Sequence, residues 1–161
     1  MTGVDLVQRL AELEQRVAAL EGDERETVVL PDSADGGGEL GYGGWVSLGG
    51  GRVSWRIDVT PERALSLADR PRIEVLAALA HPARVDIVRS LLARGPQPAT
   101  ALQEAARLGS TGQLYHHLKA LTGSGVVEQD KRGSYRLRSA ATVPVLVLLT
   151  AASDVAGQLR A

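Results

Sequence analysis

The chain has 161 residues, a formal net charge of −1 and no cysteine. This length suits one compact domain with an additional segment, and it is short for two full domains. Without cysteine, neither a disulfide framework nor a thiolate metal centre can form, so we expect a cytoplasmic protein. The longest apolar stretch, residues 143–152, is too short to span a membrane.

The near-neutral total conceals a difference between the two parts of the chain. Residues 1–70 carry 13 acidic against 7 basic side chains, whereas residues 71–161 carry 11 basic against 6 acidic ones. A basic C-terminal part favours a polyanionic partner. A solvated basic face would give the same count, so charge alone leaves both interpretations open.

Residues 1–21 have the apolar spacing of a coiled-coil dimerisation helix. The predicted seam consists of Leu6, Leu10, Leu13, Val17 and Leu20. In a parallel dimer this register pairs arginines with glutamates of the other chain, such as Arg9 with Glu14. The segment is short for an isolated coiled coil, so an amphipathic helix folded onto its own domain is the alternative.

The next segment changes from linker to strand composition. Residues 22–44 are acidic and glycine-rich, with too little apolar surface to fold alone, and we predict a linker. The run WVSLGGGRVSWRIDV predicts a β-hairpin over residues 45–59 that contains Trp45 and Trp55. Because two strands are unstable alone, we expect both rings to pack on the main domain or a dimer partner. A ligand pocket lined by the tryptophans is the alternative.

Residues 60–161 have the pattern of a helical domain. Thr60, Asp69 and Pro82 mark the starts of three helices, and the third ends at Gly95. In the second of these helices we predict a core-facing stripe of Ile73, Leu76, Leu79 and Ala80.

Further elements complete this domain. A short helix is expected from about Thr100 to Gly109, followed by the helix that contains GSTGQLYHHLKAL and by a hairpin with its tip at residues 130–133. The last element is an apolar helix capped by Thr142. This order predicts a mainly α (α+β) fold, a winged helix-turn-helix domain preceded by the coiled-coil helix and the Gly/Trp hairpin.

Helical phase divides GSTGQLYHHLKAL into two faces. One face is expected in the core and carries Leu114, His117, Leu118 and Leu121. The opposite face carries Gly112, Tyr115, His116 and Lys119, with Gln113 on its flank. These hydrogen-bonding and cationic groups, without an acid, suit phosphates and base edges in a major groove.

The histidines favour neither a metal site nor a catalytic one. His116 and His117 diverge by about 100 degrees on a helix, so they are poorly placed to chelate one ion. We expect His117 to be partly buried and hydrogen-bonded to a neighbouring element, His116 to face DNA and His81 to cap a helix. Ser110 and Thr111 serve as a helix cap, and no acid orients a histidine, so we expect no enzyme.

Three stretches, LAHPARVDIVRSLLARG, TALQEAARLGSTGQLYHHLKALTGSGVVEQ and DKRGSYRL, resemble the ArsR-type winged-helix transcriptional regulators over roughly the C-terminal half. The resemblance implies a homodimer that binds an imperfect palindrome in double-stranded DNA, with repression as the commoner outcome. The DNA contacts predicted on this basis are Ser110, Thr111, Gln113, Tyr115, His116, Lys119, Lys131, Arg132 and Arg136. Pairing is expected partly through the last helix, at Val145, Leu148 and Leu149.

The sequence also departs from this family. Metal-sensing members use cysteines, or His and acidic ligands on the last helix, whereas this chain has no cysteine and only Asp154 in that helix. We therefore expect neither a metal nor a cofactor, and an effector, a small molecule or a protein, is left open. The alternative function is a winged-helix protein-interaction module without specific DNA binding. High salt would weaken binding to DNA but not an apolar protein contact.

Overall fold

The computed structural model divides the chain into two compact units, Met1–Gly36 and Gly37–Ala161. It describes residues 9, 37–48, 51–130 and 133–159. The predicted coiled-coil seam in residues 1–21 lies outside the described residues, as do Lys131 and Arg132 at the tip of the predicted hairpin.

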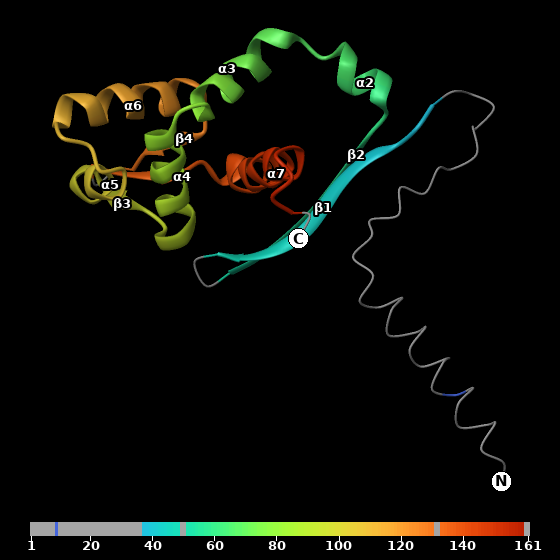
Figure 1. The fold of residues 1–161 in the computed structure, drawn as a ribbon, viewed down its shortest axis with the longest axis horizontal. Helices are drawn as coiled ribbons and strands as arrows, with labels where there is room; N and C mark the ends of the chain where they lie inside the picture. The colour runs from blue at the N-terminus through green and yellow to red at the C-terminus, as the bar shows by residue number, and fades with distance from the viewer. Residues whose placement is uncertain (1–8, 10–36, 49–50, 131–132, 160–161) are drawn as a thin grey trace. The chain divides into compact units, whose positions relative to one another are not determined.

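The second unit begins with a long antiparallel hairpin (Figure 1), formed by β1 (Leu40–Leu48) and β2 (Gly51–Val59). Leu40 pairs with Val59, so the first strand starts inside the stretch predicted as a linker up to residue 44. The glycines there do not prevent pairing, because a strand ladder uses backbone groups and the partner strand covers the bare backbone. The Trp55 ring, for example, lies 3.7 Å from where a Cβ on Gly44 would stand.

Three helices follow, α2 (Pro61–Ser66), α3 (Asp69–Leu79) and α4 (Pro82–Arg94). Thr60 caps α2 by accepting a hydrogen bond from the Arg63 amide at 3.1 Å, and Gly95 with φ 74° ends α4, as predicted. Asp69 is not the cap of α3, because it is the first helical residue and its carboxylate instead pairs with Arg72.

The predicted core stripe of α3 is wrong for three of its four residues. Ile73 and Leu76 are 57% and 52% exposed, and Ala80 is exposed as well, whereas Ala78 and Leu79 are buried. The reason is that buried side chains of α3 lie only at its C-terminal end, where the helix meets α4 and α6. Helical periodicity gives the apolar face of a helix but does not say how much of its length is covered.

The helix-turn-helix consists of α5 (Ala99–Ala105) and α6 (Thr111–Gly123). Pro98, rather than Thr100, stands at the N-cap of α5, without a side-chain cap. The turn contains Arg107, which has φ 52° and lies inside the stretch predicted as a short helix up to Gly109. A left-handed conformation costs a non-glycine residue about 1–2 kcal/mol.

The wing is part of a three-stranded sheet in the order β3 (Gln97–Pro98), β5 (Ser134–Leu137), β4 (Val127–Gln129). Its turn is closed by the Gly133 amide, which donates to the Asp130 carbonyl at 3.1 Å, so the predicted tip is confirmed. The edge strand β3 is tied to α4, since the buried Gln97 amide donates to the Ser90 carbonyl at 2.9 Å. These bonds fix the base of the wing on the helical core.

The last helix, α7 (Ser139–Val155), begins earlier than predicted. Thr142 does not cap it, because its hydroxyl lies within the first turn and donates to the Arg138 carbonyl at 3.1 Å. None of the helices in the described ranges is long and apolar enough to cross a membrane.

One hydrophobic core joins α3 to α7 and the small sheet. Its most deeply buried side chains are Ile87, Leu102, Leu114, Leu118, Leu121, Val88, Val126, Val127 and Val145. The described residues therefore form a helix-rich α+β fold with two antiparallel sheets, which confirms the predicted winged helix-turn-helix class (Figure 1).

Candidate nucleic-acid interface

Helix α6 is divided into two faces as the sequence predicts. Its buried residues are Leu114, His117, Leu118 and Leu121. The exposed side chains include Gln113, Tyr115, His116 and Lys119, and Tyr115 is 52% exposed. The helix thus presents hydrogen-bonding and cationic groups to solvent while its apolar face anchors it in the core.

The start of α6 is well defined. The Ser110 hydroxyl accepts a hydrogen bond from the Gln113 amide at 3.3 Å, and Thr111 is the first helical residue. No acidic residue lies in the first turn. Because the N-terminus of a helix carries a partial positive charge, this end is electrostatically suited to a phosphate of a nucleic acid.

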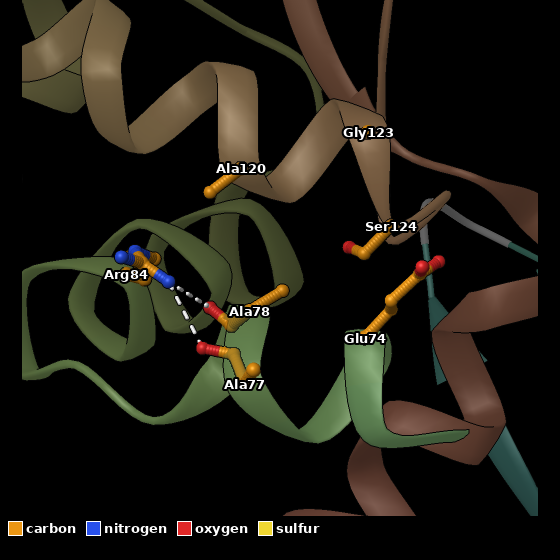
Figure 2. A pocket seen from close by; sticks show the side chains of 7 residues that line it. All are labelled: Glu74, Ala77, Ala78, Arg84, Ala120, Gly123 and Ser124. Carbon is orange, nitrogen blue, oxygen red and sulfur yellow. Dashed lines mark hydrogen bonds between the residues drawn. The ribbon is translucent and has the colours of Figure 1, made fainter. Parts of the chain in front are cut away.

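Arg84 is a residue of α4, and its side chain connects this helix to α3 and α6. Its Nη1 donates to the carbonyls of Ala77 and Ala78 at 2.9 and 3.4 Å, as Figure 2 shows. Its Nε donates to Nδ1 of His117 at 3.4 Å. One side chain therefore links the end of α3, the start of α4 and the middle of α6, and contributes to the orientation of the exposed face.

His81 and His117 lie beside Arg84 and have structural roles, whereas His116 is on the exposed face of α6. The rings of His81 and His117 are 4.4 Å apart, and Nδ1 of His81 accepts a bond from the Ala83 amide at 3.1 Å. Burial lowers the pKa of His117, and the nearby His81, Arg84 and His116 lower it further. Neutral His117 can accept the bond from Arg84, so both its predicted burial and its hydrogen bond to a neighbouring element are confirmed.

No three His, Cys, Asp or Glu residues within the described ranges are grouped in a way that could hold a metal ion. His81 is a helix cap, and His117 is engaged by Arg84. The third histidine, His116, is exposed on α6 and has neither of these two roles. Packing and hydrogen bonds account for the positions of His81 and His117.

Of the DNA contacts predicted in the wing, Arg136 lies within the described residues. Arg136 on β5 is paired with Glu128 on β4 at 2.7 Å, and Arg138 lies 3.8 Å from the same carboxylate. The Arg136 side chain remains 48% exposed. Exposed ion pairs contribute about 0–1 kcal/mol, so a phosphate could replace Glu128 as the partner of Arg136.

Helix α6 and the wing lie near each other at Tyr115 and Tyr135. Burial raises the pKa of the Tyr135 hydroxyl, and Tyr115 of α6 raises it further. Tyr135 is 8% exposed, whereas Tyr115 is open to solvent. Tyr115 of α6 is therefore close enough to Tyr135 of β5 for their hydroxyls to interact electrostatically.

Sequence reasoning missed Arg107. This exposed residue occupies the left-handed position of the turn that leads into α6. It adds a cation shortly before Ser110, and the turn is supported by Gln103, whose amide donates to the Leu108 carbonyl at 3.2 Å. The sequence predicts a helix up to Gly109 and therefore places Arg107 inside that helix, whereas the helix ends at Ala105 and Arg107 lies in the turn.

The predicted dimerisation residues of α7 differ in their surroundings. Val145 is 2% exposed and belongs to the core of its own chain. Leu148 and Leu149 are partly buried against that core. Of the three, Leu148 and Leu149 keep more surface for a partner, and a dimerisation role stays a prediction.

The two tryptophans do not share one environment. Trp45 is 62% exposed, and the Arg52 guanidinium lies 4.5 Å from the centre of its ring. Trp55 is partly buried, and its Nε1 has no hydrogen-bond partner among the described residues. Trp45 does not pack on the main domain, because the register places it on the polar face of the hairpin beside Arg52 and Arg56, and packing of this ring on a dimer partner stays a prediction.

Comparison with known families supports the helix-turn-helix assignment. Residues 79–130, from the end of α3 to the wing, match a family model described as a helix-turn-helix domain. This match covers the turn, α6 and the predicted contacts from Ser110 to Lys119. The chain thus carries a helix-turn-helix domain, a class of fold that binds DNA in transcription regulators. No curated protein matches the chain.

Proposed function

We propose that the protein is a sequence-specific DNA-binding transcriptional regulator, a non-metal-sensing repressor of the ArsR type that acts as a homodimer on a palindromic operator. The observation that carries this proposal is the exposed, acid-free face of α6 within a helix-turn-helix. A face on which Gln113, His116 and Lys119 are all open to solvent suits base edges and phosphates.

In the proposed complex, α6 lies in the major groove. The Gln113 amide is suited to adenine, and His116 and Lys119 are suited to guanine or phosphate. Ser110 and Thr111 at the start of the helix contact a backbone phosphate in the proposed complex. Tyr115, on the exposed face of the same helix, also contacts the DNA. Arg136, together with Lys131 and Arg132 at the wing tip, contacts the flanking backbone.

The proposed dimer places two copies of α6 in successive major grooves. Their half-sites are then separated by about 34–36 Å, one turn of DNA. The pairing surfaces are the seam in residues 1–21 and the exposed parts of Leu148 and Leu149. Two-fold symmetry of the protein requires a palindromic operator.

The test is selection of bound DNA from a random pool with the full chain, followed by titration of the selected site. We expect a palindromic consensus, and replacing Gln113 and His116 with alanine should remove about 1–3 kcal/mol of discrimination per lost base contact. Gln158→Ala, an exposed change beyond α7, is the matched control. Unchanged selectivity in the double variant would exclude both side chains from the reading surface.

Salt dependence separates this function from a protein-interaction module. A regulator that contacts phosphates loses affinity steeply as salt rises, and alanine at Lys131 and Arg132 should lower the salt slope by roughly one unit per lost contact. Absence of any consensus, with binding to DNA weak at every salt concentration, would support the interaction module instead.

A further inference from the structure

A second feature of the structure is a pocket of about 610 Å³ that is lined by the end of α4, strand β5, the first turn of α7 and Ser47 of β1. Small-molecule sites commonly have volumes of about 300–1,000 Å³. The pocket lies on the side of the wing base, and its lining includes Arg136 of the wing.

The polar groups of this pocket are suited to an anion. Arg94 and Arg136 line it together with the hydroxyl-bearing Ser139 and Thr142, and no acidic residue is among the described residues that line it. Arg136 is paired with Glu128 at 2.7 Å, and a bound carboxylate replaces this exposed ion pair, which contributes only about 0–1 kcal/mol. Arg94 forms no ion pair with any residue that the structure describes. Two guanidinium groups can hold a carboxylate by charge-assisted hydrogen bonds.

The remaining wall is apolar. Leu91 is 3% exposed and belongs to the core, and Leu92 and Leu137 are packed against that core. All three line the pocket. A ligand that satisfies both walls therefore has an anionic head and an apolar body.

A smaller pocket of about 310 Å³ near the C-terminal end of α6 does not share this chemistry. Figure 2 shows its one arginine, Arg84, bonded to two carbonyls of α3, with the Glu74 side chain on the opposite side. Arg84 also donates to His117. Its donors are already used for folding, so the pocket at Arg94 is the better anion site.

We propose that the pocket between α4, β5 and α7 binds a small amphipathic carboxylate, with its head at Arg94 and Arg136 and its apolar body on Leu92 and Leu137. The site explains how an effector could act, and this regulatory step rests on the proposed DNA-binding function. A carboxylate bound to Arg136 competes with a DNA phosphate for the same guanidinium. By linkage, the ligand lowers DNA affinity by the factor by which DNA lowers ligand affinity.

Binding is tested without DNA, on the full chain, by amide NMR titration with octanoate as the probe. We expect octanoate to shift the amide signals of Gly95 and Ser139. Octanol keeps the apolar body and lacks the charge, so the protein should bind octanol about tenfold or more weakly than octanoate. Arg94→Gln should weaken octanoate binding by a similar factor. Arg89→Gln, the same change at an exposed arginine of α4 outside the pocket, should leave it unchanged.

Equal affinity for octanol and octanoate, or equal losses in the two arginine variants, would overturn the site. The regulatory step is tested separately on the selected operator, where octanoate should raise the Kd of the wild type but not of Arg94→Gln. Octanoate binding with unchanged operator affinity would overturn regulation through Arg136. Failure of DNA selection leaves the NMR result unaffected, so the two proposals fail in distinguishable ways.

Discussion

The two antiparallel hairpins of the protein differ in how they are stabilised. The strands β1 and β2 have nine residues each, whereas β4 and β5 have three and four. Yet Val127 and Tyr135 of the short hairpin are 1% and 8% exposed, and Trp45 of the long one is 62% exposed. Strand length therefore does not determine how firmly a hairpin is held; cover by a third element does.

The wing has that cover on two sides. Strand β3 pairs with β5 along one edge, and the side chains of Val127 and Tyr135 reach the core formed by the helices. In the long hairpin, the register places apolar residues such as Tyr42 and Ile57 on one face and charged residues such as Arg56 on the other. Ile57 remains 42% exposed, so the apolar face is only partly covered by other residues.

The largest expected effect is loss of the Tyr135 side chain. Tyr135→Ala leaves a cavity in the core beneath the wing, and replacing a large buried aromatic side chain costs about 3–5 kcal/mol of unfolding free energy. Urea unfolding followed by far-ultraviolet circular dichroism measures this loss. Trp45→Ala serves as the control, and a similar loss in that variant would contradict the contrast between the hairpins.

A second test uses the location of both tryptophans in the long hairpin. Intrinsic tryptophan fluorescence reports on β1 and β2, whereas circular dichroism reports mainly on the helices. Because the hairpin has few buried contacts, we expect its fluorescence transition at lower urea, by about 1 kcal/mol or more in local opening free energy. Coincident transitions would show instead that the hairpin and the domain unfold as one cooperative unit.

The sequence predicted those parts of the fold that depend on local signals. Helical phase placed His117 with the leucines and His116 outside, and the cap at Thr60 and the reversal at Gly95 were correct. These features depend on residues a few positions apart, so periodicity and capping chemistry determine them.

Features that depend on distant residues were missed. Nothing near Ile73 shows that α3 is covered only at its end, and the strand at Leu40 exists because β2 pairs with it. The hydrogen bond of His117 to a neighbouring element was expected, but its partner, Arg84, lies 33 positions away and was not identified. The pocket at Arg94 likewise requires the assembly of α4, β5 and α7, so only the exposed face of the candidate interface could be predicted from the sequence.

Acid should act on the winged-helix domain and not on the long hairpin, which contains no histidine. The pKa of His117 is lowered in the folded chain, chiefly by burial. The unfolded chain therefore takes up the proton first, and stability is lost as the pH falls from about 6.5 through the folded pKa. We expect the dichroism midpoint in urea to fall between about pH 7.5 and 5.5.

His117→Gln is the matched variant for this titration, because the glutamine carbonyl can still accept from Arg84 but does not titrate. Its midpoint should depend less on pH over the same range. An identical pH dependence in wild type and variant would assign the acid sensitivity to another group. The fluorescence transition of the hairpin should move less than the dichroism transition.

The smallest expected effect concerns the exposed contact between Arg52 and Trp45. A cation over an exposed aromatic ring contributes about 0.5–1 kcal/mol, so Arg52→Gln should lower the fluorescence midpoint of the hairpin slightly and leave the dichroism midpoint of the helices unchanged. Arg63→Gln, an exposed change in α2 with the same loss of charge, is the control and should move neither. A shift of the dichroism midpoint in Arg52→Gln would mean that the long hairpin supports the helical core, and the contrast with the wing would then be one of degree.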